Sequence, residues 1–183
     1  MSKFSFYKSN DFFDIWKYEP DIFHAFPMRM EPISVSWRVR CIIEYFVGYE
    51  VYYIKDKEKK DSWMGYCVIS NGRNPRYKFA TKDDIIFGRY FIENKYRGKG
   101  IAKKMLIAIL NDCNLQYKNA FAYLNKSNVV SFNAISGIGG IEVDRFNLKG
   151  LFRRVVHNQD GDYILMKYIY KEKKNEDCSS STT

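Results

Sequence analysis

The chain has 183 residues, of which 46% are hydrophobic, and its formal net charge is +9. This length and composition fit one folded domain with a sizeable core and exclude an intrinsically disordered chain. The four cysteines form no CxxC pair, so the sequence predicts neither a zinc site nor a disulfide framework. The charge favours a polyanionic partner, but it does not choose between nucleic acid, an acidic membrane and a phosphate-rich small molecule.

The expected cellular compartment follows from the absence of an apolar membrane-spanning or signal segment in the sequence. No apolar run approaches the roughly 18 residues of a membrane helix, and residues 1–7 lack the apolar core of a signal peptide. Scattered cysteines fit a reducing compartment, so we expect a cytoplasmic protein without a membrane span. We expect one domain over residues 1–170 and a polar, disordered tail over residues 171–183.

The first quarter of the chain predicts a strand and two helices. Residues 4–7 alternate and predict a strand, and Ser9 or Asn10 is a potential cap for a helix that runs to Tyr18. Residues 20–33 hold three prolines and predict irregular structure. A second helix begins at Ser34 or Ser36 and ends at Gly48. Its apolar positions follow helical spacing: Val35, Val39, Ile42, Ile43 and Phe46.

The rest of the chain predicts mostly strands. Residues 50–55 and 62–70 predict a hairpin across a charged turn. Residues 84–93 have the near-continuous apolar middle of a central strand, and an apolar-faced helix follows from Gly100 to about Asn114. The remaining elements are strands at 121–124, 141–148, 151–157 and 163–168 and a short helix at 128–136. The order predicts an α/β fold in which one mixed central sheet carries helices on both faces.

The segment that joins the central strand to the next helix carries the chemistry. It reads Tyr96-Arg97-Gly98-Lys99-Gly100-Ile101-Ala102. The first N–H groups of a helix lack partners and carry partial positive charge, and glycines let a ligand approach the backbone closely. A strand, a glycine-rich turn and a helix therefore form an anion site that suits a pyrophosphate. The following Lys103 and Lys104 either add charge to this site or lie on a solvated face.

Two common phosphate-binding patterns do not fit this segment. A Walker loop requires Gly-Lys-Ser/Thr, but Gly100 is followed by Ile101. The dinucleotide fingerprint requires a third glycine where this chain has Lys103. A third reading, in which Gly98 and Gly100 are simply turn residues, remains open.

Two further segments follow in an informative order. Asn128-Val129-Val130-Ser131 opens the predicted short helix, and Gly139-Gly140-Ile141 precedes the next strand. With Arg97-Gly98-Lys99-Gly100-Ile101-Ala102, which fits the pattern Arg/Gln-x-x-Gly-x-Gly/Ala after a strand, these motifs resemble the GNAT superfamily of acetyl-CoA-dependent N-acetyltransferases. The order of elements from Phe4 to Tyr168 is similar to the whole fold of that family.

The resemblance implies a set of cofactor contacts. Acetyl-CoA would be the co-substrate, and no metal is expected. Backbone N–H groups over residues 97–102 would hold its pyrophosphate, the backbone at Phe91 and Ile92 would pair with the pantetheine arm, and Asn128 and Ser131 would contact pantetheine or the acyl end. The implied cofactor-binding residues are Phe91, Ile92, Arg97, Gly98, Lys99, Gly100, Ile101, Ala102, Asn128 and Ser131. Asn128 also has a plainer reading as a helix cap.

The catalytic positions are less clear. Acetyl transfer to an amine requires a base, and the leaving thiolate benefits from a proton donor. Where many family members have an acidic residue or His, and later a Tyr, this chain has Gly88 and Ile135. The substitutes are Tyr90, which a regular strand would place on the same face as Gly88, and Glu93 at the strand's end. His24 and His157 are further alternatives, and each of the four side chains also has a reading as core or surface.

The acceptor is expected between the first helices and the last strand pair. Aromatic and arginine side chains gather there in the sequence: Trp16, Phe23, Phe26, Trp37, Arg38, Phe146, Phe152 and Arg153. Because Arg pairs with phosphate and stacks on rings, we hypothesise a nucleotide-linked amino sugar as the amine acceptor. The same side chains also fit an aromatic core.

The sequence favours an acyltransferase that works by direct transfer in a ternary complex, since no cysteine has a recognisable activating base. The alternative is a catalytically inactive CoA-binding sensor or scaffold, which the missing side chains at Gly88 and Ile135 favour. A nucleic-acid-binding module lacks a recognised reading motif. We therefore expect a small-molecule amine as partner, no nucleic acid, and leave a homodimer open.

Overall fold

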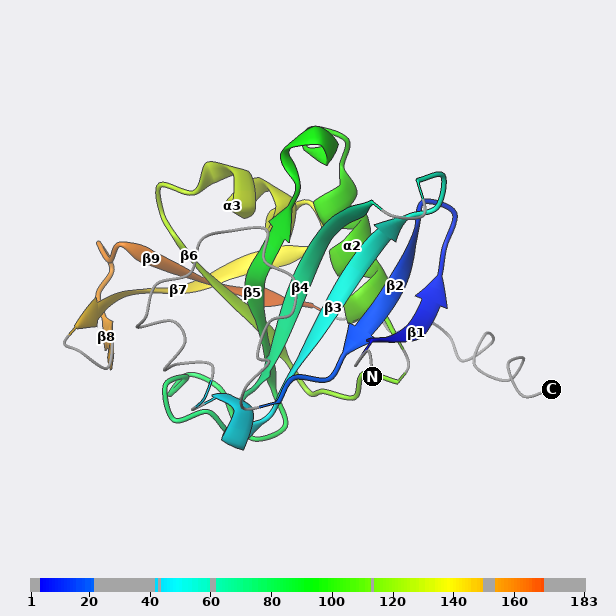
Figure 1. The fold of residues 1–183 in the computed structure, drawn as a ribbon. Helices are drawn as coiled ribbons and strands as arrows, with labels where there is room; N and C mark the ends of the chain where they lie inside the picture. The colour runs from blue at the N-terminus through cyan, green and yellow to red at the C-terminus, as the bar shows by residue number, and fades with distance from the viewer. Residues whose placement is uncertain are drawn as a thin grey trace.

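In the computed structural model, residues 4–21, 42, 44–59, 62–112, 114–149 and 154–169 are described. Within these residues nine strands form one sheet in the order β1-β2-β3-β4-β5-β6-β9-β7-β8 (Figure 1). All neighbours pair antiparallel except β5 and β6. The strands are β1 Phe4–Ser9, β2 Phe13–Tyr18, β3 Tyr49–Asp56, β4 Trp63–Asn71, β5 Ile85–Ile92, β6 Ala120–Asn125, β7 Gly140–Lys149, β8 Arg154–His157 and β9 Tyr163–Tyr168. The predicted mixed α/β architecture is confirmed.

Between these strands the described chain contains the 3₁₀ turn η1 Asn94–Tyr96 and the helices α2 Ile101–Leu110 and α3 Val129–Ser136. Residues 42 and 44–47 are also helical, and Gly48 follows them with φ 96° and a bond from its N–H to the Glu44 carbonyl. The rest of the helix predicted from Ser34 or Ser36, the irregular segment 20–33 beyond residue 21, and the tail 171–183 lie outside the described residues. Strand predictions in the described chain are confirmed, while α2 ends at Leu110 rather than Asn114.

The helix predicted from Asn10 to Tyr18 is wrong, because this segment forms strand β2. Phe13 and Ile15 are fully buried, while Asp14 between them and Trp16 after them are only partly buried. This alternation over residues 13–16 has the period of two of a β-strand. The Asn10 carboxamide accepts hydrogen bonds from the N–H groups of Phe12 and Phe13 at 2.9 and 3.0 Å. The same Asn geometry caps helices and closes turns, so it did not distinguish between the two.

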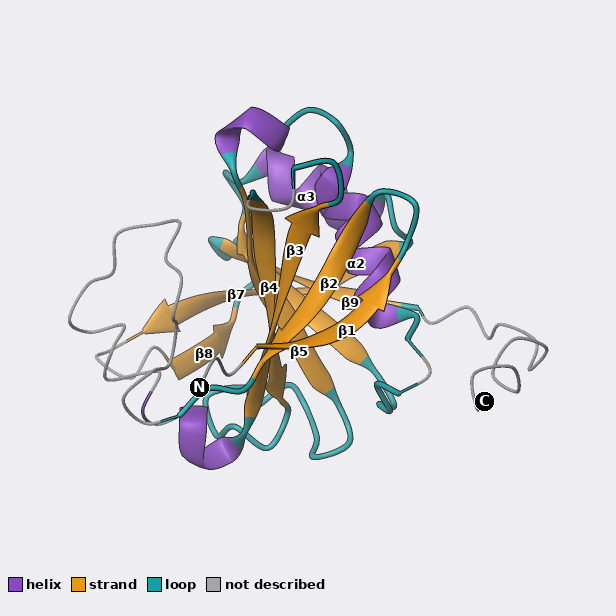
Figure 2. Ribbon diagram, turned by 45° about the vertical axis from the view of Figure 1, so that its right-hand side comes forward, coloured by secondary structure: helices purple, strands orange, loops and turns teal. Residues whose placement is uncertain are grey.

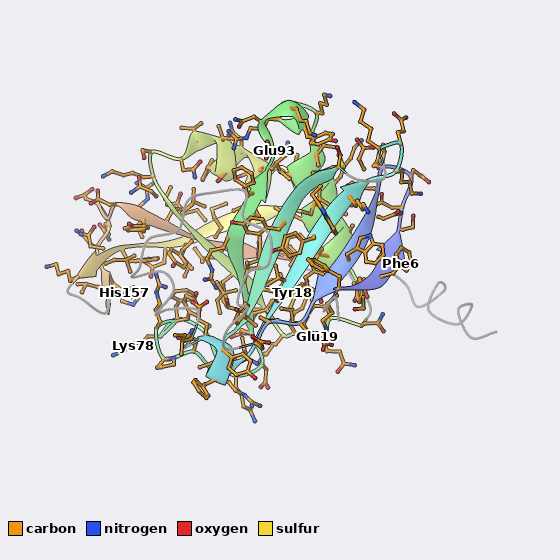
Figure 3. The ribbon with its side chains drawn as sticks, viewed as in Figure 1. Phe6, Tyr18, Glu19, Lys78, Glu93 and His157 are labelled. Atoms are coloured by element: carbon orange, nitrogen blue, oxygen red, sulfur yellow. The ribbon has the colours of Figure 1, made fainter. Side chains whose placement is uncertain are left out.

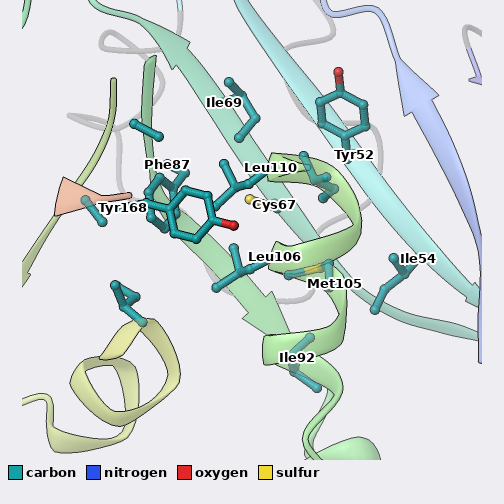
Figure 4. Packing of buried hydrophobic residues seen from close by; sticks show 14 of the residues in the cluster. Tyr52, Ile54, Cys67, Ile69, Phe87, Ile92, Met105, Leu106, Leu110 and Tyr168 are labelled. Atoms are coloured by element: carbon teal, nitrogen blue, oxygen red, sulfur yellow. The ribbon is translucent and has the colours of Figure 1, made fainter. Parts of the chain in front are cut away.

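The sheet separates two layers of core. On one face, α2 and α3 cover the largest cluster, in which Met105, Leu106 and Leu110 of α2 are fully buried (Figures 2 and 4). The opposite face carries two aromatic clusters. The first is centred on Tyr53 and Tyr66 of β3 and β4, and the second on Phe121, Phe146 and Leu165 of β6, β7 and β9. The helical residues 44–47 lie on this opposite face, since Glu44 pairs there with Arg89.

Strand β5 contains a bulge that decides which side chains face each layer. Val68 pairs with Arg89 and Ile69 with Phe87, so Gly88 is skipped in the ladder. Phe87 and Tyr90 therefore face α2 and α3, while Gly88 and Arg89 both line a cavity on the opposite face. The expectation that Tyr90 shares a face with Gly88 is wrong, because one extra residue in a strand reverses the alternation beyond it.

The core beneath α2 gives a stability prediction. Leu106 is 0% exposed, whereas its neighbour Ile107 is 42% exposed. We expect Leu106→Ala to lower the free energy of unfolding by about 2–5 kcal/mol because it leaves a cavity in a packed cluster. The control Ile107→Ala should change it by less than about 0.5 kcal/mol. Urea denaturation measures both, and equal losses in the two variants would contradict the packing described for this helix.

Candidate functional site

The turn between β5 and α2 exposes unpaired backbone donors. Gly98 and Gly100 have φ values of 76° and 71°, and a Cβ atom at either would meet nothing within 4 Å. Gly100 caps α2 without a side-chain bond, and the first helical bond runs from Lys104 N–H to the Gly100 carbonyl. The N–H groups of residues 101–103 therefore have no helical acceptor. An anion that approached this open turn would meet these donors and the positive end of the helix dipole.

Side chains on both sides fix this turn onto the sheet. The Arg97 guanidinium donates from Nε to the Ile92 carbonyl at 2.8 Å and lies 5.2 Å from the Phe91 ring. The Tyr96 hydroxyl donates to Asp56 Oδ2 at 2.8 Å, a bond that lowers the pKa of Asp56. Arg97 thus engages the end of β5 with its side chain and the Asn94 carbonyl with its N–H, while the two glycines lie on the open side of the turn.

The two lysines in the first turn of α2 are engaged elsewhere. Lys104 Nζ lies 3.2 Å from the centre of the Phe12 ring in the β1–β2 turn. Lys103 reaches toward the end of α3, where a Cβ atom on Gly137 would lie 2.3 Å from Lys103 Nζ. Neither lysine is simply solvated, and in this conformation both heads contact other elements.

Beyond the turn, one edge of β5 is open. Strands β5 and β6 pair only at Ile85–Ala120 and Ile86–Phe121, after which they draw apart (Figure 1). From Phe87 to Ile92 the strand pairs with β4 on one side and has no described pairing with β6 on the other. β6 is still near at Gly88, where a Cβ atom would lie 3.7 Å from the Tyr123 carbonyl oxygen. An extended ligand can pair with such an edge as an added strand would. By strand geometry, Gly88 to Ile92 spans about 13 Å.

Tyr90 and the first turn of α3 meet beside this open edge. The Tyr90 hydroxyl is buried and makes no hydrogen bond within the described chain. Burial raises the pKa of Tyr90 above its ordinary value, and the nearby Ser131 side chain partly offsets this rise. Asn128 caps α3 by accepting a hydrogen bond from the Ser131 N–H at 3.1 Å, so its plainer reading is confirmed. The fold thus brings a strand and a later helix together around one hydroxyl.

Glu93 and His157, the other described candidates for catalysis, lie at two separate places in the fold (Figure 3). Glu93 ends β5 beside the turn, where its N–H donates to the Met64 carbonyl. His157 lies in β8, is 71% exposed and pairs through Nδ1 with Asp144 Oδ2 at 2.5 Å. His24 lies outside the described residues.

A cavity of about 130 Å³ opens on the face opposite α2, where β5 and β6 begin to separate. Its lining residues come from β4, β5, β6 and the β4–β5 loop: Val68, Ser70, Tyr77, Ile86, Gly88, Arg89 and Tyr123. Gly88 therefore lies at the wall of a cavity, whereas Ile135 is 1% exposed in the main core. Of the two positions without the family's usual side chain, Gly88 borders open space and Ile135 fills packed space.

Three charged side chains next to this cavity were missed in the sequence. Arg89 donates from Nη2 to Glu44 Oε2 at 2.5 Å and to Ser70 Oγ at 2.9 Å, and Arg76 donates to the Tyr123 hydroxyl at 2.9 Å. Burial by itself would lower the pKa of Arg89, but Glu44 raises it, so the guanidinium stays charged. The sequence could have pointed to two of them, because Arg89 is a single arginine inside an apolar strand and Glu44 is a single glutamate on an apolar helix face.

The aromatic and arginine side chains that were predicted to surround the acceptor are described only in part. Trp16 packs against the first aromatic cluster, and Phe146 belongs to the second. The other members lie outside the described residues: Phe23, Phe26, Trp37, Arg38, Phe152 and Arg153.

Among the described residues no group of three or more His, Cys, Asp or Glu side chains is placed to hold a metal ion. No helix in that part of the chain has the length and apolar character needed to span a membrane.

No protein-family model and no curated protein sequence matches the chain. Solved structures do match it. The smu.2055 protein of Streptococcus mutans UA159 aligns over 78% of this chain and 82% of its own, with a TM-score of 0.52 and 18% identity. An IAA acetyltransferase from Bacillus cereus aligns over 71% of this chain and 83% of its own, with a TM-score of 0.51 and 16% identity.

A spermidine N-acetyltransferase from Vibrio cholerae, solved with CoA and spermine, aligns over 75% of this chain and 76% of its own. The TM-score is 0.50 and the identity is 13%. At these identities the likeness concerns only the arrangement of the chain in space. The chain has the fold of the GNAT acetyltransferases.

Proposed function

We propose that this chain is an acetyl-CoA-dependent N-acetyltransferase that acts on a small-molecule amine. The observation that carries the proposal is the continuity of two features: the open N-terminus of α2 and the unpaired edge of β5, joined by the turn at Gly98 and Gly100. The first suits a pyrophosphate, and the second suits an extended amide-bearing chain. The neighbours named above as acetyltransferases, one of them solved with CoA, support the same reading.

In this proposal the backbone makes most of the cofactor contacts. Residues 98–102 present N–H groups to the pyrophosphate, with Ile101 and Ala102 at the start of the helix, whereas the Arg97 N–H already donates to the Asn94 carbonyl at 3.2 Å. Phe91 and Ile92 offer their free edge to the pantetheine arm, although the Ile92 carbonyl also accepts the Arg97 side chain. Asn128 and Ser131 stand at the first turn of α3, beside Tyr90.

The transfer itself removes two protons from the acceptor nitrogen and adds one to sulfur. The acceptor ammonium loses its first proton to water or a base, its nitrogen then bonds to the thioester carbon, and the carbon–sulfur bond breaks. The nitrogen then loses its second proton to water, and the departing thiolate gains one from a donor. We assign Tyr90 as the donor that protonates the departing thiolate, because its hydroxyl is buried, protonated at neutral pH and unpartnered within the described chain. Glu93, at the turn end of β5, stays a prediction of the sequence. Holding both substrates in one cleft supplies a further share of the rate.

Direct transfer in a ternary complex fits the described cysteine. Cys67 is fully buried in the main core, and burial raises the pKa of its thiol to about 12. A protonated, inaccessible thiol is a poor nucleophile. The competing proposal is a CoA-binding domain without catalysis, for which Gly88 and Ile135 are the support. Thiol release that depends on an acceptor excludes it.

Acetyl-CoA should stabilise the folded chain. At about 100 times its Kd a ligand adds about 2.7 kcal/mol, which for this size is a rise of roughly 5–10 °C in melting temperature. Gly100→Glu should abolish this rise, because a carboxylate would repel the pyrophosphate and block the turn. Differential scanning fluorimetry with and without acetyl-CoA measures both results.

The matched control is Gly48→Glu. Gly48 has the same left-handed conformation with φ 96° and the same open surroundings, so each variant carries a similar backbone strain of about 1–2 kcal/mol. Gly48→Glu should retain the full rise with acetyl-CoA. A full rise in Gly100→Glu would show that the cofactor site is misplaced, and no rise in the unaltered chain would reject the proposed function.

Tyr90→Phe should lower kcat about 10²-fold or more by removing the proton donor, with little change in the KM for acetyl-CoA because the ring remains. The pKa of Tyr90 lies above its ordinary value of 10.0, and an acid works below its pKa. The ratio of kcat in the unaltered chain to kcat in Tyr90→Phe should therefore stay constant from pH 7 to 9. Thiol release under saturating acetyl-CoA measures these rates.

The control for this substitution is Tyr7→Phe, which also removes a partly buried hydroxyl with a raised pKa, about 12, but on strand β1. It should keep kcat. If Tyr90→Phe behaved like Tyr7→Phe, the donor would have to be another group.

A further inference from the structure

Two consecutive residues of β5, Gly88 and Arg89, face the same side of the sheet. Both line the cavity opposite α2, whereas Phe87 before them and Tyr90 after them pack against the main cluster beneath α2. The cause is the bulge, since the ladder to β4 skips Gly88. In a regular strand the alternation would continue, so that Arg89 would face α2 and Tyr90 would face the cavity.

Arg89 is the one charged residue of β5, whose other side chains are apolar or aromatic. The cluster beneath α2 is apolar, and its members Phe87, Cys67 and Leu106 are fully buried (Figure 4). A guanidinium turned toward this cluster would be buried without a partner, which carries a large penalty. Tyr90 carries no charge and gives no such preference. The charge of Arg89 therefore favours the bulged register over the regular one.

On the opposite face Arg89 has a charged partner. Arg89 Nη2 donates to Glu44 Oε2 at 2.5 Å and to Ser70 Oγ at 2.9 Å, and Arg89 takes part in further interactions. Glu44 is 3% exposed, and within the described chain its carboxylate accepts one hydrogen bond, from Arg89. Glu44, Arg89 and Arg76, whose Nη1 lies 4.0 Å from Glu44 Oε1, form a charged cluster. Loss of the Glu44 charge would therefore act on β5 through Arg89.

We propose that the ion pair between Glu44 and Arg89 fixes the bulge in β5 and thereby keeps the Tyr90 hydroxyl on the side of α3. Glu44 and Arg89 are then positioning residues, because they act on the reaction through Tyr90. A buried ion pair suits this role, since it can specify one arrangement of the chain while adding little net stability. The inference rests on the proposed function, because it takes Tyr90 as the proton donor.

The first test removes the charge of Glu44. Glu44→Gln keeps the size of the side chain and should lower kcat about 10-fold or more with little change in the KM for acetyl-CoA, because a small displacement of a reacting group is costly. Glu44→Asp keeps the charge and should lose less. The matched control is Asp112→Asn, which should keep kcat, since Asp112 is 5% exposed and pairs with Lys8 at 2.8 Å away from β5. Thiol release with spermidine and with glucosamine as acceptors measures the rates.

A double-mutant cycle separates a positioning role from a general loss of structure. In the Tyr90→Phe background, Glu44→Gln should lower kcat less than about 2-fold, because two changes that act through one group do not add. Two independent effects would instead multiply.

A spectroscopic readout follows Tyr90 without turnover. The chain is labelled with 3-fluorotyrosine, and the fluorine resonance of Tyr90 is assigned by its absence in Tyr90→Phe. This resonance should shift in Glu44→Gln, because the hydroxyl leaves its place beside α3, and it should stay in place in Asp112→Asn.

A paired variant covers the case in which Glu44→Gln does not fold. Glu44→Met combined with Arg89→Met removes both charges of the pair, and apolar replacement of a buried pair often costs little stability. The melting temperature should stay close to that of the unaltered chain. kcat should still fall about 10-fold or more, because no charge on β5 then favours the bulged register.

The outcomes separate this inference from the proposed function. An unchanged kcat in Glu44→Gln or in the paired variant, losses that multiply in the cycle, or an unmoved Tyr90 resonance each overturn the positioning role and leave the acetyltransferase intact. Absence of any acetyl-CoA effect on the melting temperature rejects the proposed function, while the Tyr90 resonance still tests the link between the ion pair and the bulge.

Discussion

The separation of β5 from β6 after Ile86 organises the candidate site. Parallel neighbours normally share a continuous ladder of hydrogen bonds, but here the ladder stops after two pairs of residues. Backbone groups from Phe87 onward then face away from β4 without a described strand partner. Every proposed cofactor contact beyond the turn depends on this open edge, and so does the cavity at its start.

The bulge at Gly88 and Arg89 gives the two sides of the cleft different chemistry. Because the ladder skips Gly88, Tyr90 faces α2 and α3, whereas Arg89 faces the aromatic clusters. The proposed proton donor therefore lies on the face that α2 and α3 cover, and the cavity that Arg89 lines lies on the opposite face. In a regular strand Tyr90 and Gly88 would share a face, and this division would not exist.

The charged cluster also explains a feature of the interior. An arginine in the middle of a sheet is costly unless it is paired, and Arg89 is paired by Glu44 and Ser70. These partners lie on the helical residues 44–47 and on β4, so the cluster ties three elements together.

Much of the fold could be read from local patterns. Alternation and apolar runs predicted the strands from β3 onward, and the glycines at 98 and 100 with the helix behind them predicted the phosphate turn. The error at residues 10–18 arose because Asn10 and the short segment after it satisfy a helix cap and a strand turn equally well. A local signal of this kind identifies a segment as helix or strand only when the segment's length and hydrophobic period agree with the signal.

By itself the sequence determined the turn and predicted an anion as its ligand, because a strand, two glycines and an apolar helix lie next to one another in the chain. Tertiary structure decided what surrounds that ligand. The bulge moved Tyr90 to the face of α3, and the sheet brought Glu44, Arg76 and Arg89 together from separate segments. Contacts between residues far apart in sequence depend on strand register and packing, and one skipped residue in β5 was enough to change which side chains meet.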